Sequence, residues 1–351
     1  MKKTALALLL CGCIALSGCS ALFDGHYESV RPHELQSGDE DAPMVAAEDY
    51  EQLLDALTDL VEDGVEESVI SVAKYRRELI AEDVRRAVEQ VQRENPIAAF
   101  AVETIRYELG TRGGTALAVE VEYIHDRTEI QKIGQVADMA EAGDAIAGSL
   151  NRCDAGIVLL VSEYQETDFV QLVENYAQEH PDLVMELPQV SVNIYPKSGE
   201  SRVVELKYSY RTSRDSLKNM RNQVQPFFDA AVLYVSGDAE PGQKYVQLSS
   251  FLMERYDYQY ATSITPTYSL LRHGVGDSKA FATVYAAMCR LADLECLVVS
   301  GTHNGESRYW NIICDEGTYY HIDLLTSGAK TWTDREMGNY VWDYSAYPKC
   351  G

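Results

Sequence analysis

The chain of 351 residues has 46% hydrophobic and 24% charged residues, and its formal net charge at pH 7 is −25. Such an excess of carboxylates repels polyanions, so we exclude nucleic acid and anionic lipid headgroups as general partners. The charge does not bear on the fold, which has to be inferred from the order of apolar and polar residues along the chain.

The first 19 residues have the pattern of a bacterial export signal. Lys2 and Lys3 precede an apolar run from Ala5 to Ala15, which is too short for an ordinary transmembrane helix. The following Leu16-Ser17-Gly18-Cys19 resembles a lipobox, the signal at which the peptide is cut before a Cys that then carries lipid. We therefore expect residues 1–19 to be a lipoprotein signal peptide, and acyl chains on Cys19 to hold the body at the extracytoplasmic face of the cell membrane. A plain secretory signal is the alternative.

Residues 20–47 have the composition of an acidic linker. The run Ser37-Gly38-Asp39-Glu40-Asp41 is polar and charged, with almost no apolar surface to bury. We expect this segment to tether the body to the membrane.

Residues 48–235 contain an internal repeat, because similar residues recur at a constant offset of 85 positions. The pairs include Val84 with Phe169, Val88 with Val173, Pro96 with Pro181, Gly114 with Gly199, and Tyr123 with Tyr208. Each copy, at about residues 65–150 and 151–235, has the pattern β-α-β-β followed by another helix. The sequence therefore predicts a duplicated α+β module with a mixed or antiparallel sheet.

The expected elements follow the same order in both copies. The first copy has a strand, a helix, two strands and a helix at Val69–Tyr75, Glu82–Arg93, Ala101–Leu109, Ala116–Ile124 and Glu129–Ser149. The second has them at Ile157–Tyr164, Thr167–Glu179, Gln189–Pro196, Ser201–Tyr210 and Ser213–Val232. A loop marked by Pro follows the first helix of each copy, and Gly113-Gly114 indicates a hairpin turn, since no helix follows it. No motif here carries chemistry, so we expect a scaffold or binding module.

Five cysteines remain outside the signal and the lipidation site, and this odd number leaves at least one without an internal disulfide partner. They are Cys153, Cys289, Cys296, Cys314 and Cys350. Cys289, Cys296 and Cys314 lie in apolar runs and suit small core positions. Cys350, next to the C-terminus, is expected to be an exposed thiol or a mobile disulfide partner. No Cys has metal-ligand spacing with a His, so we expect no metal and no cofactor.

After a linker at Ser236–Gly242, the chain from Lys244 to Tyr260 has a helical pattern. A second helix is expected after Gly274, with Phe281, Tyr285 and Met288 on one face. Three strands follow, at Leu294–Ser300, Tyr309–Cys314 and Thr318–Asp323, and Asp315-Glu316-Gly317 connects the last two as a hairpin. The aromatic residues of the tail are expected to pack onto this domain, and they are Trp332, Tyr340, Trp342, Tyr344 and Tyr347.

This order of turn, helix and three strands resembles the transglutaminase-like family, relatives of the papain-like cysteine proteases. The shared motifs are Val298-Val299-Ser300-Gly301, Arg308-Tyr309-Trp310-Asn311, where the family has His-Ala-Trp-Asn, and Tyr319-Tyr320-His321-Ile322-Asp323. The resemblance implies a transglutaminase-like domain at residues 243–351, with Trp310 and Asn311 as binding residues. It places the family's catalytic Cys, His and Asp at Ser278, Arg308 and Asp323.

Two of these three positions have changed their chemistry. A Ser hydroxyl is a weak nucleophile unless a base takes its proton, and Arg stays protonated and cannot be that base. We therefore expect the domain to act in binding or scaffolding at the cell envelope, with an envelope protein or peptide as partner. The alternative is an active peptidase or protein-glutamine acyltransferase that has recruited His273, His303 or His321 as its base.

Of these, His321 is the best placed, because residues two apart in a strand point to the same face and Asp323 follows it by two. Two hypotheses describe Arg308. It can bind an anion together with the N-terminus of the helix at Ser278, or it and Asp323 can satisfy only each other.

Overall fold

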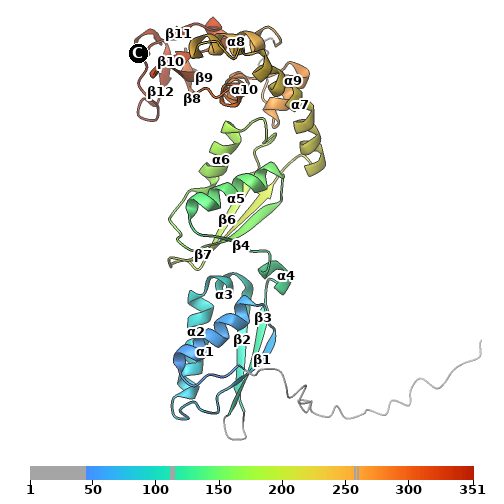
Figure 1. Cartoon of the computed structure of the whole chain (residues 1–351), viewed down its shortest axis with the longest axis vertical. Helices are drawn as coiled ribbons and strands as arrows, with labels where there is room; N and C mark the ends of the chain where they lie inside the picture. Colours follow the sequence, from blue (N-terminus) through green and yellow to red (C-terminus); the bar gives the residue numbers. More distant parts are fainter. Residues whose placement is uncertain (1–44, 111–114, 257, 259–260) are drawn as a thin grey trace, which may run out of the picture. The chain divides into compact units, whose positions relative to one another are not determined.

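The structure is a computed structural model that describes residues 45–110, 115–256, 258 and 261–351 (Figure 1). The expected signal peptide with Cys19, nearly all of the linker and the Gly113-Gly114 turn lie outside the described residues. Within the described part, no helix is long and apolar enough to cross a membrane.

The first module contains three helices and a three-stranded antiparallel sheet. Its elements are α1 (Tyr50–Glu62), β1 (Glu67–Ser71), α2 (Ile80–Glu94), α3 (Pro96–Ala101), β2 (Val102–Leu109) and β3 (Ala116–Tyr123), and the strand order is β1-β3-β2. The apolar faces of α1 and α2, with Leu57 and Val84, are buried in one core with Leu117 of β3. Ala47, expected in the linker, is only 1% exposed and belongs to this core.

Two sequence expectations need correction in the first module. The helix α1 was not anticipated, although Asp49 caps it by accepting the Gln52 N–H at 3.0 Å. Pro96 was expected in a loop, but it is the first residue of α3, where its missing N–H costs nothing and where Asn95 caps the helix.

The second module has a four-stranded sheet in the order β4-β5-β7-β6. Its elements are α4 (Arg127–Ile130), β4 (Gly134–Val136), α5 (Met139–Asn151), β5 (Gly156–Val161), α6 (Phe169–Glu179), β6 (Gln189–Tyr195) and β7 (Arg202–Ser209). The single helix expected at Glu129–Ser149 is wrong, because α4 ends early and β4 intervenes. Asp138 then caps the N-terminus of a separate helix, α5, because its side chain accepts the N–H groups of Ala140 and Glu141.

The strand orders β1-β3-β2 and β5-β7-β6 correspond, and the strands in both sets are antiparallel. The second module differs by the additional strand β4, which pairs in parallel with β5. The two modules therefore share a local topology, and their origin by duplication stays a prediction.

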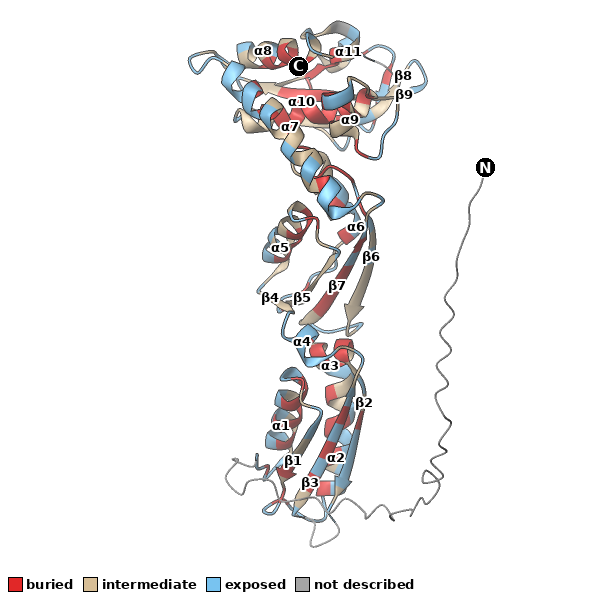
Figure 2. Ribbon diagram, turned by 90° about the vertical axis from the view of Figure 1, so that its right-hand side faces the viewer, coloured by how far each residue is buried: buried red, intermediate tan, exposed pale blue. Residues whose placement is uncertain are grey.

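The C-terminal domain places helices on one face of a five-stranded antiparallel sheet of order β11-β10-β9-β8-β12. The helices are α7 (Arg214–Tyr234), α8 (Pro241–Met253), α9 (Pro266–His273), α10 (Ser278–Leu291) and the short α11 (Leu324–Ser327). The strands are β8 (Cys296–His303), β9 (Glu306–Asp315), β10 (Thr318–Ile322), β11 (Thr331–Trp332) and β12 (Tyr340–Trp342). Figure 2 shows α10 buried over much of its length.

Helix α7 contacts both the second module and the C-terminal domain. Its N-terminal end contacts the second module, where Arg214 forms an ion pair with Asp154 at 2.7 Å. Its later residues Val224 and Phe228 are buried in one core with Phe281 of α10. The helix ends at Tyr234, next to the boundary that the sequence suggested near residue 235, although its buried residues Val224 and Phe228 already belong to the core of the C-terminal domain.

Turn chemistry was predicted well in the C-terminal domain. The β9–β10 hairpin has positive φ angles at Glu316 (49°) and Gly317 (80°), which is the left-handed conformation that Gly adopts freely.

The expected helix from Lys244 is found as α8, but it already begins at Pro241 and ends at Met253.

The other face of the sheet carries an aromatic core. Trp310, Tyr340 and Trp342 are at most 8% exposed and pack there with Val299. The expected packing of the tail onto the domain is confirmed for Tyr340 and Trp342, whereas Tyr344 remains 61% exposed.

Candidate functional site

Ser278 is the first residue of α10 and lies at the helix N-terminus, as the sequence predicted. The preceding Asp277 caps the helix, because its side chain accepts the Ala280 N–H at 2.9 Å. Ser278 is 6% exposed, and its Oγ accepts the backbone N–H of Tyr309 at 3.1 Å. The positive end of this helix therefore already faces a carboxylate, that of Asp277.

Arg308 and Asp323 form a bidentate ion pair. Arg308 Nε donates to Asp323 Oδ2 and Nη2 donates to Oδ1, both at 2.9 Å. The Arg308 side chain is 14% exposed and that of Asp323 only 1%. Such a planar, charge-assisted pair fixes both groups in one orientation. The expectation that Asp323 orients residue 308 agrees with this geometry.

Asp323 accepts three further hydrogen bonds. They come from the backbone N–H of Leu325 (3.0 Å), the hydroxyl of Thr326 (3.0 Å) and the hydroxyl of Tyr340 (2.7 Å). Burial, the largest cause, raises the pKa of Tyr340 to about 12, so its phenol remains a donor at neutral pH. The carboxylate is thus held by at least five donor contacts and is neutralised by Arg308.

His321 is fully buried, and both of its ring nitrogens are occupied. Trp310 Nε1 donates to His321 Nδ1 at 3.0 Å, and His321 Nε2 lies 3.0 Å from Asp334 Oδ1. An indole N–H only donates, so Nδ1 is the acceptor and the proton of the neutral imidazole is on Nε2. Burial lowers the pKa of His321, although the nearby Asp334 opposes this shift.

The other two candidate bases have different surroundings. His303 stacks on the ring of Tyr340 with 4.1 Å between centroids, and His273 is exposed at the end of α9, edge-on to Tyr268. Among the residues that the structure describes, no His side chain is hydrogen-bonded to Ser278 Oγ.

Trp310 and Asn311 are internal residues of the domain. Trp310 is 1% exposed and Asn311 is fully buried. Asn311 Nδ2 donates to the backbone carbonyls of Ala282 in α10 (2.9 Å) and Leu297 in β8 (3.3 Å). In this arrangement Asn311 fastens the helix to the sheet, and no exposed surface of either residue is offered to a ligand.

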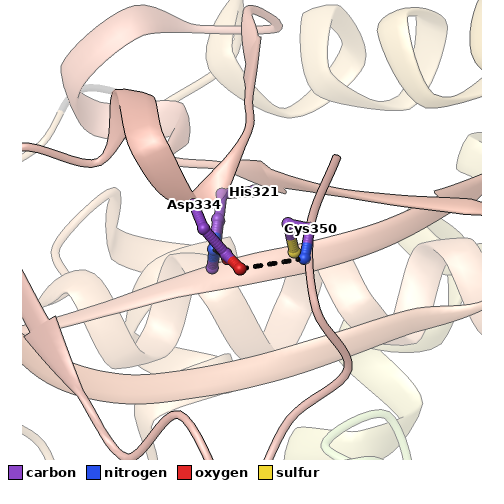
Figure 3. A group of neighbouring side chains, drawn as sticks. All are labelled: His321, Asp334 and Cys350. Atoms are coloured by element: carbon purple, nitrogen blue, oxygen red, sulfur yellow. Dashed lines mark hydrogen bonds and ion pairs between the residues drawn. The ribbon is translucent and has the colours of Figure 1, made fainter.

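A second polar group was not anticipated from the sequence. Figure 3 shows His321 of β10 beside Asp334, from the short 3-10 helix Asp334–Glu336, and Cys350 of the tail. One potential ligand atom from each lies within 4.8 Å of the others, and Cys, His and Asp are all zinc ligands. A metal on Nε2 would displace its proton, however, and Nδ1 cannot take that proton because it faces the Trp310 N–H. This arrangement therefore does not fit a metal ion.

The same group attaches the end of the chain to the domain. The Cys350 N–H donates to Asp334 Oδ2 at 3.3 Å, and the Asp334 N–H donates to the Cys350 carbonyl at 3.1 Å. The expected exposed thiol at Cys350 is wrong, since the residue is 2% exposed. Burial raises the pKa of Cys350 to about 12 and keeps it as an unreactive thiol. All five cysteines in the described part are free.

Comparison with known proteins supports the resemblance. Residues 229–343 match the family model described as the Transglutaminase-like superfamily. A solved structure of a TGase aligns with 9% identity and a TM-score of 0.28, over 49% of this chain and 51% of the other. No curated protein matches the sequence.

Two further solved structures are similar. A putative cysteine protease from Cytophaga hutchinsonii aligns with 12% identity and a TM-score of 0.28, over 44% of this chain and 65% of that one. A putative protease from Parabacteroides distasonis aligns with 10% identity and a TM-score of 0.25, over 48% and 39%. The matches span less than two thirds of each of these proteins.

Proposed function

Because the C-terminal third of the chain is a transglutaminase-like domain, we propose that the protein is a cell-envelope lipoprotein whose domain binds or scaffolds and does not catalyse. The observation that carries this proposal is the bidentate pair of Arg308 and Asp323 at the family's His and Asp positions. The guanidinium cannot accept a proton, so the residue that replaces the family's base cannot activate Ser278.

The surroundings of Ser278 support the same conclusion. A catalytic base must come within hydrogen-bond reach of the proton that it removes. Ser278 Oγ accepts the Tyr309 N–H, and the nitrogens of His321, the best-placed alternative base, are bonded to Trp310 and Asp334. The loss of a single triad member in a well-studied protease lowers turnover by up to about a million-fold, so two changed positions weigh strongly against catalysis.

The membrane anchor of this proposal rests on sequence. Leu16-Ser17-Gly18-Cys19 follows a short apolar run, which is typical of a lipoprotein signal. Lipid on Cys19 would hold the modules at the extracytoplasmic face, where an envelope protein or peptide is the partner.

We do not extend the proposal to an anionic ligand at Ser278. Arg308 is neutralised by Asp323, and the helix N-terminus faces Asp277. A bound carboxylate would have to compete with two carboxylates that are already in place.

The test uses the full chain and a fluorophosphonate probe, which labels activated serines. We expect no labelling of Ser278, with Ser278→Ala as the matched control and a known serine hydrolase as the positive control. Labelling that disappears in Ser278→Ala would overturn the proposal and favour the enzyme. Release of ammonia from a glutamine-containing peptide, lost in the same variant, would have the same meaning.

Two variants test whether Ser278 and Arg308 occupy the family's catalytic Cys and His positions. Ser278→Cys alone should react more slowly with iodoacetamide than the double variant, because Asp323 neutralises Arg308 and no imidazolium is present to favour the thiolate. Ser278→Cys combined with Arg308→His should gain thiol reactivity, since the imidazole would lie between Cys and Asp323 as in the family. Tryptophan fluorescence of each variant checks that the domain remains folded.

A further inference from the structure

A cavity of about 810 Å³ is lined mostly by the second module, together with Phe100 of α3, beside the edge of β5 that β4 only partly covers. We call it the β5 notch and define it by its residues Lys132, Asp144, Gly148, Gly156 and Val158. Its volume is within the range of sites that bind small molecules and peptides. It belongs to a different module from Ser278 and is independent of the function proposed for that site.

The pairing of the strands leaves backbone groups open in the notch. The parallel ladder of β4 and β5 begins at Gly134 opposite Leu159 and ends at Val136 opposite Val161. The first three residues of β5, from Gly156 to Val158, therefore have no partner in β4. Among the strands of the described residues, only β7 pairs with them, on their other side.

Two hydrogen bonds show which residues face the open edge. The Tyr208 N–H of β7 donates to the carbonyl of Ala155, whereas the Ser162 N–H donates to the carbonyl of Val136 in β4. Odd-numbered residues of this stretch therefore bond towards β7 and even-numbered ones towards β4. Gly156 thus directs its N–H and C=O, and Val158 its N–H, into the notch, whereas the Val158 carbonyl faces Gly134 of β4. An unpaired strand edge of this kind is a template for another strand.

The walls of the notch suit a polypeptide with both kinds of charge. Lys132 and Asp144 are exposed, and neither side chain has an ion pair or hydrogen bond within the described chain. The other charged groups in the lining already have partners. Arg152 pairs with Asp154 and Lys207 with Glu205, both at 2.8 Å, and Glu129 accepts the Asp126 N–H at 3.1 Å. A ligand with one acidic and one basic side chain would complement the two unpaired charges.

We propose that the β5 notch binds an extended peptide segment of a partner protein, which adds to the sheet along Gly156–Val158. Three strand residues span about 10 Å, so the segment contributes a short added strand that ends where β4 begins. Main-chain hydrogen bonds supply affinity in this mode of recognition, and Lys132 and Asp144 select the charges that flank the segment.

In the experiment, the full chain in detergent is incubated with a pooled library of hexapeptides. Each peptide is built from Val and Thr and contains one Glu and one Lys. We expect retained peptides that slow hydrogen–deuterium exchange of the Val158 amide at least about tenfold. The same peptides with alternate backbone nitrogens methylated should not bind, because they lack the donors that pair with the strand.

Two substitutions in α5 provide a matched control. Gly148 lines the notch, and a Cβ there would meet only the flexible Arg152 Nη1 at 3.3 Å, so Gly148→Leu should fold and weaken binding about tenfold or more. A Cβ on Gly143 would meet nothing within 4 Å, so Gly143→Leu should leave binding unchanged.

Four results would overturn the proposal. They are the absence of any retained hexapeptide, equal binding of the methylated peptides, binding unaffected by Gly148→Leu, and a Val158 amide that is already protected in the free chain. The last result would mean that a segment of the chain itself fills the notch.

Discussion

Replacing Asp323 by Ala should destabilise the C-terminal domain more than any other change to its polar groups. Asp323 is 1% exposed and accepts at least five hydrogen bonds, two of them from Arg308. Removing one partner of a buried ion pair costs about 3–5 kcal/mol, because the other charge is left buried without compensation. The lost cap of α11 and the lost partner of Tyr340 add to this, so we expect a value near the upper end of the range.

The converse substitution should cost less. Arg308→Met leaves the Asp323 carboxylate with the Leu325, Thr326 and Tyr340 donors, so we expect a loss of about 2–3 kcal/mol. The double variant should lose less than the sum of the two single losses, by about 1–3 kcal/mol, because both changes remove one interaction.

The assay follows urea unfolding of the full chain by tryptophan fluorescence. The three tryptophans are Trp310, Trp332 and Trp342, so the signal reports the C-terminal domain alone. Glu306→Ala, at an exposed position on the same strand as Arg308, is the control and should leave the midpoint unchanged. A loss below about 1 kcal/mol for Asp323→Ala would refute the reasoning, since it would mean that the pair is solvated or dispensable.

Three other predictions concern separate parts of the chain. Intact-mass analysis of protein extracted from membranes should show an N-terminal, acylated Cys19, and Cys19→Ala should release the chain from the membrane fraction; an unlipidated N-terminus elsewhere would contradict this. Burial lowers the pKa of His321 in the folded state, so its contribution to stability is complete above the unfolded pKa of about 6.5 and is lost as the pH falls from that value through the lower folded pKa. The melting temperature by tryptophan fluorescence should therefore fall between about pH 7.5 and 5.5, and His321→Asn should flatten this slope; an unchanged slope would assign the effect to other groups. Gly301→Ala should cost about 1–3 kcal/mol in the urea assay, because the new Cβ would collide with the Val341 carbonyl and lie 2.7 Å from Trp310 Cη2; a neutral result would mean that β12 can move away.

The sequence alone determined the elements whose signals are local. The apolar period of α10, the Gly317 turn of the β9–β10 hairpin and the three strands that follow α10 all appeared close to the predicted positions. Arg308 and Asp323 also form the pair that the family motifs implied. Helix periods and turn residues act over a few positions, so one stretch of chain is enough to reveal them.

The tertiary structure decided what depends on distant residues. The expected helix at Glu129–Ser149 contains β4, because Gly134–Val136 finds a parallel partner in β5 that helical periodicity does not register. Sequence spacing placed His321 beside Asp323, yet the ring is bonded to Trp310 and Asp334. Cys350 is buried for a similar reason, since Asp334 and Tyr319 bind the last residues of the chain. The protonation and exposure of these side chains follow from partners up to 31 positions away, which come together only when the sheet is packed.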